Sequence, residues 1–155
     1  MSTRMQIATA GTPILIYQHS DGYPSYALAT LLPFLVEFHK GRGHDSEYLP
    51  AQLLARMISR RQKEQDEFHA QHPDLATFRD NFTGYGIDTQ LHGDIEYLYE
   101  IDELGGLTVS TVTYQVGVRK FVKLAKFKLG TTYKAAMARL ERLSKRRKSW
   151  AHIAA

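Results

Sequence analysis

The chain has 155 residues, of which 43% are hydrophobic and 23% are charged, and it contains no cysteine. This length predicts one domain, and the lack of cysteine excludes a disulfide framework, thiol catalysis and thiolate zinc sites. No apolar run approaches the roughly 20 residues of a membrane-spanning helix, and the first residues lack the apolar segment of a secretory signal. We therefore expect a cytoplasmic protein with no membrane partner.

The formal net charge of +4 conceals a strong asymmetry along the chain. Residues 1–110 carry 8 Lys and Arg against 15 Asp and Glu, a net charge of −7. Residues 111–155 carry 12 Lys and Arg against the single acid Glu141, a net charge of +11. This asymmetry indicates a cationic segment that binds a polyanion or an acidic partner, or one that packs against the acidic part of its own or a neighbouring subunit.

The N-terminal part predicts a β-hairpin followed by a helix. Two β-prone runs, residues 5–10 and 14–17, flank a Gly-Thr-Pro turn, which is typical of a hairpin. From Ser25, which is placed to cap a helix, apolar residues recur every three or four positions up to a helix end near Gly41. Pro33 lies inside this helix and should kink or divide it.

A second helix is expected from Asp45 or Ser46 to about Gln71. Beyond Ile58 its sequence is almost wholly polar, so we expect this end to project into solvent or to contact a partner. Residues 73–86 then form a connection.

The next segment predicts strands. Residues 94–102 alternate in polarity, and one face of the alternation is formed by Ile95, Tyr97, Tyr99 and Ile101. This period is typical of a half-buried strand. Two glycines then turn the chain into the β-prone run 107–118, which predicts an antiparallel hairpin. Residues 120–129 predict a third strand or a short helix.

A last helix, amphipathic and basic, is predicted over about 131–148, with Thr131 or Thr132 as its cap. The order of elements is therefore β-β-α-α-β-β-(β)-α. This order predicts a single α+β domain over residues 1–155, with an antiparallel β-sheet and three helices.

Two motifs near the N-terminus resemble one known family. The chain starts Met-Ser-Thr-Arg, and residues 17–24 read Tyr-Gln-His-Ser-Asp-Gly-Tyr-Pro ahead of the leucine-rich helix. This combination resembles a group of uncharacterised small bacteriophage and prophage proteins that have an MSTR start and a Y-x-H-x-D-G-Y-P segment. Residues 93–99 look like the strand where the pattern of that family resumes.

The resemblance covers firmly about the first 40 residues, and the basic C-terminal part lies outside it. It implies a phage or mobile-element context, because the family has no established activity that could be carried over. It also implies that one loop matters for packing or for function, through Tyr17, Gly22, Tyr23 and Pro24.

Two His–Asp pairs are the candidate catalytic residues. His19 and Asp21, and likewise His92 and Asp94, lie two positions apart beside a predicted strand. A carboxylate near an imidazole suits acid–base chemistry, and two such pairs brought together could hold a metal for hydrolysis. The simpler alternative, which we favour, is that Asp21 and Gly22 shape a tight turn on which aromatic residues pack.

The polar face of the strand predicted over residues 94–102 is acidic, with Asp94, Glu96, Glu100 and Asp102. These carboxylates could bind Mg²⁺, or could imitate a phosphate backbone to capture a nucleic-acid-binding host protein. We favour a third interpretation, in which a neighbouring strand opposes them with Lys120, Lys123 and Lys128.

The candidate binding surface for a nucleic acid or a partner lies in the last helix and just after it. Its cations are Lys134, Arg139, Arg142, Lys145, Arg146, Arg147 and Lys148. Lys and Arg neutralise phosphates and release counterions, and exposed aromatic residues in the same third of the chain can stack on unpaired bases. The sequence contains no phosphate-binding loop, dinucleotide fingerprint or nucleophile elbow, so it predicts no cofactor and no resident metal.

The sequence therefore favours a phage or mobile-element accessory protein that acts by binding. Its partner would be a nucleic acid or the acidic surface of a host protein that handles one, as for a host-defence inhibitor or a regulator. One alternative is a metal-assisted hydrolase, which requires the side chains of His19 and His92 to lie close together. Another is a structural or assembly protein that self-associates into a homo-oligomer.

Overall fold

In the computed structural model, which describes residues 2–78, 84–115 and 118–146, the first residues form the predicted hairpin. Strands β1 (Met5–Thr9) and β2 (Leu15–Gln18) pair antiparallel, with Ile7 opposite Ile16. Gly11 in the connecting turn has a φ of 84°, a conformation that glycine adopts at no steric cost. The Gly-Thr-Pro sequence therefore forms the predicted turn.

Helix α1 (Pro24–Arg42) begins at a proline, which suits the first helical position because its missing N–H would be unpaired there anyway. Pro33 lies inside α1 but does not divide it. The helix keeps its apolar side on the core while Pro33 itself is exposed. Most helices in proteins are stabilised by packing of their apolar side. In α1 this packing outweighs the one backbone hydrogen bond that Pro33 cannot donate, because proline has no N–H.

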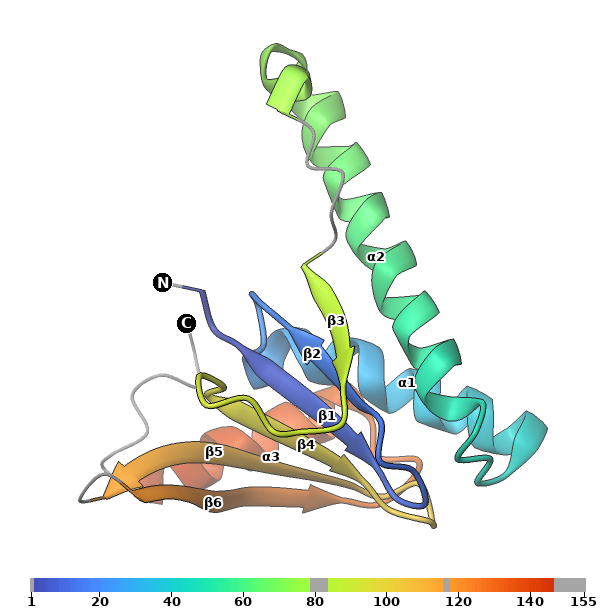
Figure 1. The fold of residues 1–155 in the computed structure, drawn as a ribbon, viewed down its shortest axis with the longest axis vertical. Coiled ribbons are helices and arrows are strands. Elements are labelled where there is room, and N and C mark those ends of the chain that lie inside the picture. The colour runs from blue at the N-terminus through green and yellow to red at the C-terminus, as the bar shows by residue number, and fades with distance from the viewer. Residues whose placement is uncertain (1, 79–83, 116–117, 147–155) are drawn as a thin grey trace.

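Helix α2 (Leu49–Gln71) projects away from the sheet along its distal half (Figure 1). Its buried residues all lie in its first half, where Leu49, Leu53 and Met57 contact the core. The projecting half is the polar part of the sequence, so the expected projection of this end is confirmed. A short 3-10 helix, η1 (Pro73–Phe78), follows it and packs back on α2.

The described residues form one six-stranded sheet in the order β3-β2-β1-β4-β5-β6. Its other strands are β3 (Tyr85–Asp88), β4 (Tyr97–Ile101), β5 (Leu107–Gln115) and β6 (Val118–Phe127). Neighbouring strands pair antiparallel except β1 and β4, which are parallel. The α+β class with three helices is confirmed, whereas β3 and the parallel pair were not predicted.

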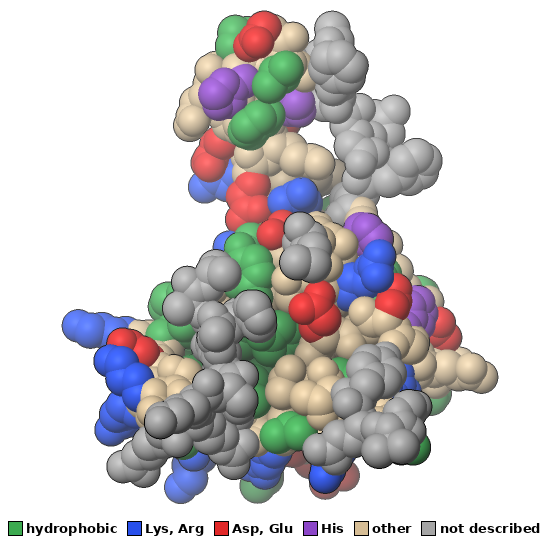
Figure 2. Space-filling view, turned by 90° about the vertical axis from the view of Figure 1, so that its left-hand side faces the viewer, with side chains coloured by type: hydrophobic (Ala, Val, Ile, Leu, Met, Phe, Trp, Pro, Cys, Tyr) green, Lys and Arg blue, Asp and Glu red, His purple; other side chains and the backbone are tan. Residues whose placement is uncertain are grey.

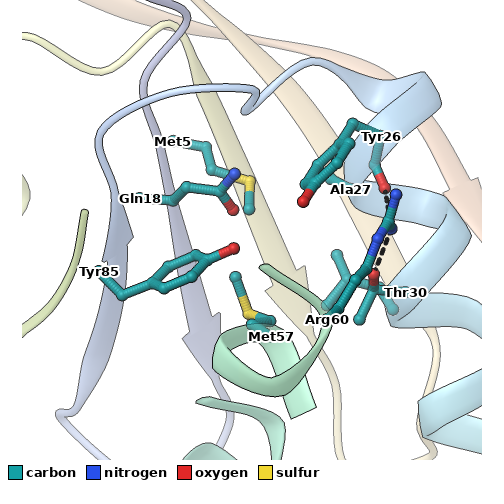
Figure 3. A pocket seen from close by; sticks show the side chains of 9 residues that line it. Met5, Gln18, Tyr26, Ala27, Thr30, Met57, Arg60 and Tyr85 are labelled. Atoms are coloured by element: carbon teal, nitrogen blue, oxygen red, sulfur yellow. Dashed lines mark hydrogen bonds between the residues drawn. The ribbon is translucent and has the colours of Figure 1, made fainter. Parts of the chain in front are cut away.

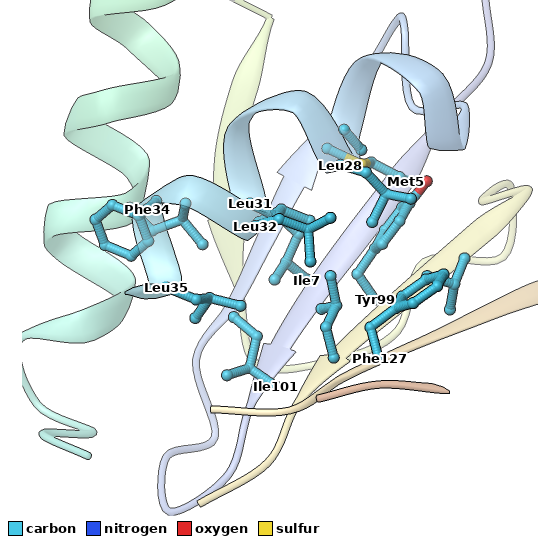
Figure 4. Close-up of a cluster of buried hydrophobic side chains, with 14 of the residues drawn as sticks. Met5, Ile7, Leu28, Leu31, Leu32, Phe34, Leu35, Tyr99, Ile101 and Phe127 are labelled. Atoms are coloured by element: carbon cyan, nitrogen blue, oxygen red, sulfur yellow. The ribbon is translucent and has the colours of Figure 1, made fainter. Parts of the chain in front are cut away.

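One face of the sheet carries the core, which α1 and α3 (Tyr133–Arg146) cover (Figure 1). Figure 4 shows α1 over the core side chains. The predicted apolar face of β4 and its flank is buried throughout, at Ile95, Tyr97, Tyr99 and Ile101. Burial of one such side chain stabilises the fold by about 1.5–3 kcal/mol, so this strand alone contributes substantially. In the part of the chain that the structure describes, no helix is long and apolar enough to cross a membrane.

Helix α3 joins the core through a narrow apolar stripe. Its Ala136 and Leu140 are fully buried, and its N-terminus is capped by the predicted Thr132, whose Oγ1 accepts a hydrogen bond of 3.3 Å from the Ala135 N–H. Met137 and Leu143 are partly buried beside them, and the charged positions Lys134, Arg139, Arg142 and Lys145 are exposed.

Among the residues that the structure describes, no helix lies on the opposite face of the sheet, and we call it the helix-free face. The connection between β3 and β4, residues 89–96, crosses in front of this face in Figure 1. Gln6 of β1 fastens the connection, since its Nε2 donates to the Gln90 carbonyl at 3.1 Å and its Oε1 accepts from the His92 N–H at 2.8 Å. Gln6 is fully buried as a result.

The Asp-Gly-Tyr-Pro loop packs directly on β1. The Gly22 N–H donates to the Thr3 carbonyl at 2.8 Å, and the Tyr99 hydroxyl donates to the Gly22 carbonyl at 2.8 Å inside the core. A Cβ atom at Gly22 would lie 2.8 Å from the Cβ of Met5. The loop therefore requires glycine at this position for close packing.

Replacing Gly22 with alanine should destabilise the fold by about 1–3 kcal/mol, the usual cost of inserting a methyl group into a closely packed site. Urea unfolding measures this change. The matched control is Gly41→Ala in α1, where nothing lies within 4 Å of the added Cβ, and which should stabilise the helix by about 0.5–1 kcal/mol. Equal unfolding free energies for the two variants would contradict the packing account.

Candidate functional site

His92 is the centre of a polar cluster on the helix-free face. Its Nε2 lies 2.7 Å from Asp88 Oδ2, and its Nδ1 lies 4.0 Å from Asp94 Oδ1. Asp94 is held in turn by Arg4 at 3.2 Å. The close partner of His92 is therefore Asp88, four residues before it, while the predicted partner Asp94 lies beyond hydrogen-bonding distance.

The hydrogen bond from His92 lowers the pKa of Asp88 below its ordinary value of 3.8, and two backbone N–H groups that bond the same carboxylate add to this effect. Asp88 therefore keeps its negative charge and fixes the orientation of the imidazole ring. A second cation contacts the cluster from β6, because the Arg119 guanidinium donates to the His92 carbonyl.

Tyr17 links the two predicted histidines. Its ring centroid lies 4.4 Å from that of His92 and 6.5 Å from that of His19, and its hydroxyl is 3.4 Å from His19 Nδ1. Burial, followed by the charge of Asp94, raises the pKa of the Tyr17 hydroxyl. The structure thus brings His19 and His92 into one cluster with a phenol ring as their shared neighbour.

Asp21, the fourth predicted catalytic residue, forms its ion pair with α2. Its backbone has a φ of 59°, which aspartate tolerates in tight turns, and its Oδ2 lies 3.4 Å from Arg61. This geometry supports the turn-forming interpretation of the Asp-Gly pair. Among the residues with described positions, no group of three or more His, Asp or Glu side chains could hold a metal ion.

Beside β1 and β2, a small cavity lies against α1 and α2, and its lining includes Gln18, Tyr26, Arg60 and Tyr85 (Figure 3). The Tyr26 hydroxyl donates to Glu64 at 2.7 Å, and the Arg60 guanidinium lies 3.9 Å from the centroid of the Tyr26 ring. Burial and this hydrogen bond raise the pKa of Tyr26. With a volume of about 10 Å³, the cavity has room for about one water molecule and admits no substrate. The contacts of Tyr26 with Glu64 and Arg60 beside it join α1 to α2.

The cations of the last third of the chain are for the most part free of carboxylates. Lys126 pairs with Asp102 at 2.9 Å and Lys145 with Glu141 at 2.9 Å. Arg139 bonds a backbone carbonyl, as Arg119 does. Within the described ranges, no hydrogen-bond or ion-pair partner occurs for the side chains of Lys120, Lys123, Lys128, Lys134 and Arg142.

These cations share one region of the molecule, which we call the cationic surface: the edge strand β6 together with the outward side of α3. Figure 2 shows Lys and Arg side chains gathered along the lower margin of the molecule, over these two elements. Of the predicted binding residues, Lys134, Arg139, Arg142 and Lys145 lie on α3 and Arg146 ends it. Arg147 and Lys148 lie outside the described residues.

The acids of residues 94–102 were predicted to pair with Lys120, Lys123 and Lys128. In the described residues one of these acids, Asp102, pairs with a lysine of β6, and that lysine is Lys126. Asp102 accepts from Lys126, which lowers the pKa of Asp102. In the described part of the chain, Lys120, Lys123 and Lys128 form no ion pair with these acids, because β5 lies between β4 and β6; Lys126 is the lysine that reaches Asp102.

Comparisons with known proteins assign no family to this chain. Its sequence matches no family model and no curated protein, and its fold matches no solved structure. The function is therefore argued from the chemistry of the two surfaces described above.

Replacing His92 with glutamine should raise the pKa of Asp88 toward 3.8, since the hydrogen bond from His92 is the largest cause of its lowering. Carboxyl ¹³C NMR over a pH titration measures this. The folded-state pKa lies below the unfolded one, so Asp88 stabilises the fold above the unfolded pKa, and this stabilisation is lost as the pH falls through the folded pKa. The variant should lose less stability over that acid range.

The control for this titration is His69→Gln at the far end of α2, which should leave Asp88 unchanged. A wild-type Asp88 that titrates at its ordinary value, or one that is insensitive to His92→Gln, would show that the pair does not form in solution.

Proposed function

We propose that this protein acts by binding nucleic acid through the cationic surface of β6 and α3. The observation that carries the proposal is the set of lysine and arginine side chains on this surface that have no carboxylate partner in the described residues. Unpaired cations that gather on one side of a protein neutralise phosphates and release the counterions that surround them.

The way α3 packs supports this proposal. Its buried positions Ala136 and Leu140 are apolar, so the helix docks without using its charges. Several acids of the first part of the chain meanwhile have partners of their own there: Asp21 pairs with Arg61, Glu37 with Arg56 and Glu64 with Arg60. Internal pairing therefore leaves most of the cationic surface available to an external anion.

The resemblance of the first 40 or so residues to phage and prophage proteins provides the setting of the proposal. In a host cytoplasm, such a protein would serve as an accessory factor, either a regulator or an inhibitor of host defence. The hydrolase alternative gains no support from metal-ligand geometry in the described residues, so binding is the function that we put forward.

Neutralising Lys120 and Lys123 together, as Lys120→Gln with Lys123→Gln, should weaken binding to single-stranded DNA at low salt. It should also reduce the slope of log K against log salt by about 1.5, since each phosphate contact contributes about 0.7–0.9 to this slope. Fluorescence anisotropy with a labelled oligonucleotide over a salt series measures both quantities.

The matched control, Lys40→Gln with Lys63→Gln, removes the same charge from the two helices on the other side of the molecule and should leave the slope unchanged. Equal slopes for the two double variants would show that net charge alone drives binding. If the wild-type protein stays unbound at low salt, the nucleic-acid proposal fails, and an acidic host protein becomes the partner to seek.

A further inference from the structure

We propose that the helix-free face of the sheet is a stacking site for the unpaired bases of single-stranded nucleic acid. This inference rests on the proposed function and names its ligand class. Whereas the cationic surface would bind phosphates, the helix-free face would take the bases. The register of β6 and a series of contacts between planar groups from β6 to β2 support this site.

The register of β6 sets alternate side chains on the helix-free face. Phe127 and Ala125 pair with Leu107 and Val109 and are buried in the core. Lys126, opposite Thr108, faces the other way. A register shift between Val109 and Ser110 then brings Lys123, opposite Ser110, and Phe121, opposite Val112, to this same helix-free side, because Ser110 and Val112 alternate with Val109 along β5. The edge strand thus presents one aromatic ring beside the Lys123 ammonium group, while the Lys126 ammonium group pairs with Asp102. A ring beside an unpaired cation suits a nucleotide chain, whose bases stack and whose phosphates are anionic.

Phe121 is accessible and is extended by a neighbouring cation. Its side chain is 37% exposed, and the Arg119 guanidinium lies 5.2 Å from the centroid of its ring. A guanidinium plane stacks on bases as an aromatic ring does, and it adds a favourable cation–π interaction. Arg119 also donates to the His92 carbonyl, so it connects β6 to the 89–96 connection.

The series of planar groups continues beyond Arg119. The His92 imidazole lies 4.4 Å from the Tyr17 ring, and Tyr17 lies 6.5 Å from His19, both measured between centroids. We call the whole set the stacking row: Phe121, Arg119, His92, Tyr17 and His19. Histidine side chains lie beside Lys and Arg on the right of the body in Figure 2, the side that corresponds to the front of Figure 1.

The length of the row suits a short stretch of single strand. It reaches from β2 to β6 across β1, β4 and β5, which at about 4.8 Å per strand is about 19 Å. Sites of about 4–16 nucleotides are usual for proteins that combine aromatic platforms with a basic groove, and this span lies at the short end. A duplex fits less well, because its bases stack on one another and expose only their edges in the grooves.

The helix-free face also carries carboxylates: Asp88 and Asp94 lie beside His92 and Arg4, whereas Glu100 has no ion pair among the described residues. Glu100 lies opposite Ala8 and Thr108, which places it on the helix-free side, and it is exposed. Its negative charge would repel a phosphate. Removal of that charge should therefore strengthen binding, a change of opposite sign to that of the other variants.

The test compares two single strands of about 12 nucleotides that carry the same phosphates, oligothymidylate and its abasic analogue, by fluorescence anisotropy at low salt. The wild-type protein should bind oligothymidylate about tenfold more tightly than the abasic strand, the effect expected when a base stacks on a ring. Phe121→Leu should remove most of this difference and leave abasic binding unchanged, whereas Phe121→Tyr, which retains a ring, should preserve it.

Two further variants separate stacking from general effects. Leu104→Ala, at a side chain that is 83% exposed in the turn between β4 and β5, should bind both strands as the wild type does. Glu100→Gln should bind both strands a few-fold more tightly. Circular dichroism verifies that each variant keeps its fold, and the exposed position of Phe121 makes leucine a mild change.

The outcomes distinguish this inference from the proposed function. Equal affinity for the two strands, lost on neutralising Lys120 and Lys123, would overturn the stacking site and keep the cationic surface. Tighter binding of a duplex than of a single strand would also overturn the stacking site. A failure to bind either strand at low salt would overturn both proposals.

Discussion

The parallel pairing of β1 with β4 is the constraint on which the rest of the structure depends. It joins the N-terminal hairpin to the strands that lie some ninety positions later, with Met5 opposite Tyr97 and Thr9 opposite Ile101. On the core side, Ile7 and Tyr99 meet beneath α1 (Figure 4). On the other side, the amide of Gln6 fixes the connection that carries His92. Loss of this pairing would therefore dismantle the core and the polar cluster together.

Much of the fold could be predicted because its signals are local. The alternation through Tyr97 and Tyr99, the turn at Gly11 and the cap at Thr132 each depend on neighbouring residues, and each is found as expected. No short turn marks the parallel pair in the sequence, because its strands are joined through β2, α1, α2, η1 and β3. Strand β3 was missed because four residues that include a glycine show no clear period.

The candidate site was predictable in composition and not in geometry. His19 and His92 do share a cluster, but through Tyr17, whose sequence position gives no hint of contact with His92. Spacing suggested Asp21 and Asp94 as partners, whereas the left-handed backbone of Asp21 turns its carboxylate to Arg61 and the bend of the connection brings Asp88 to His92. The charge asymmetry was visible in the sequence, but whether it is neutralised depends on strand order, which is non-local.

The central claim is that the cationic last third remains free for a nucleic acid. Amide ¹H–¹⁵N NMR spectra of the full chain, recorded while an unlabelled single-stranded oligonucleotide is added at low salt, test it most directly. The account predicts shift changes confined to β6, α3, residues 17–19 and residues 89–96, with the distal half of α2 unaffected. Changes centred on α2, or spectra that do not change at all, would contradict it.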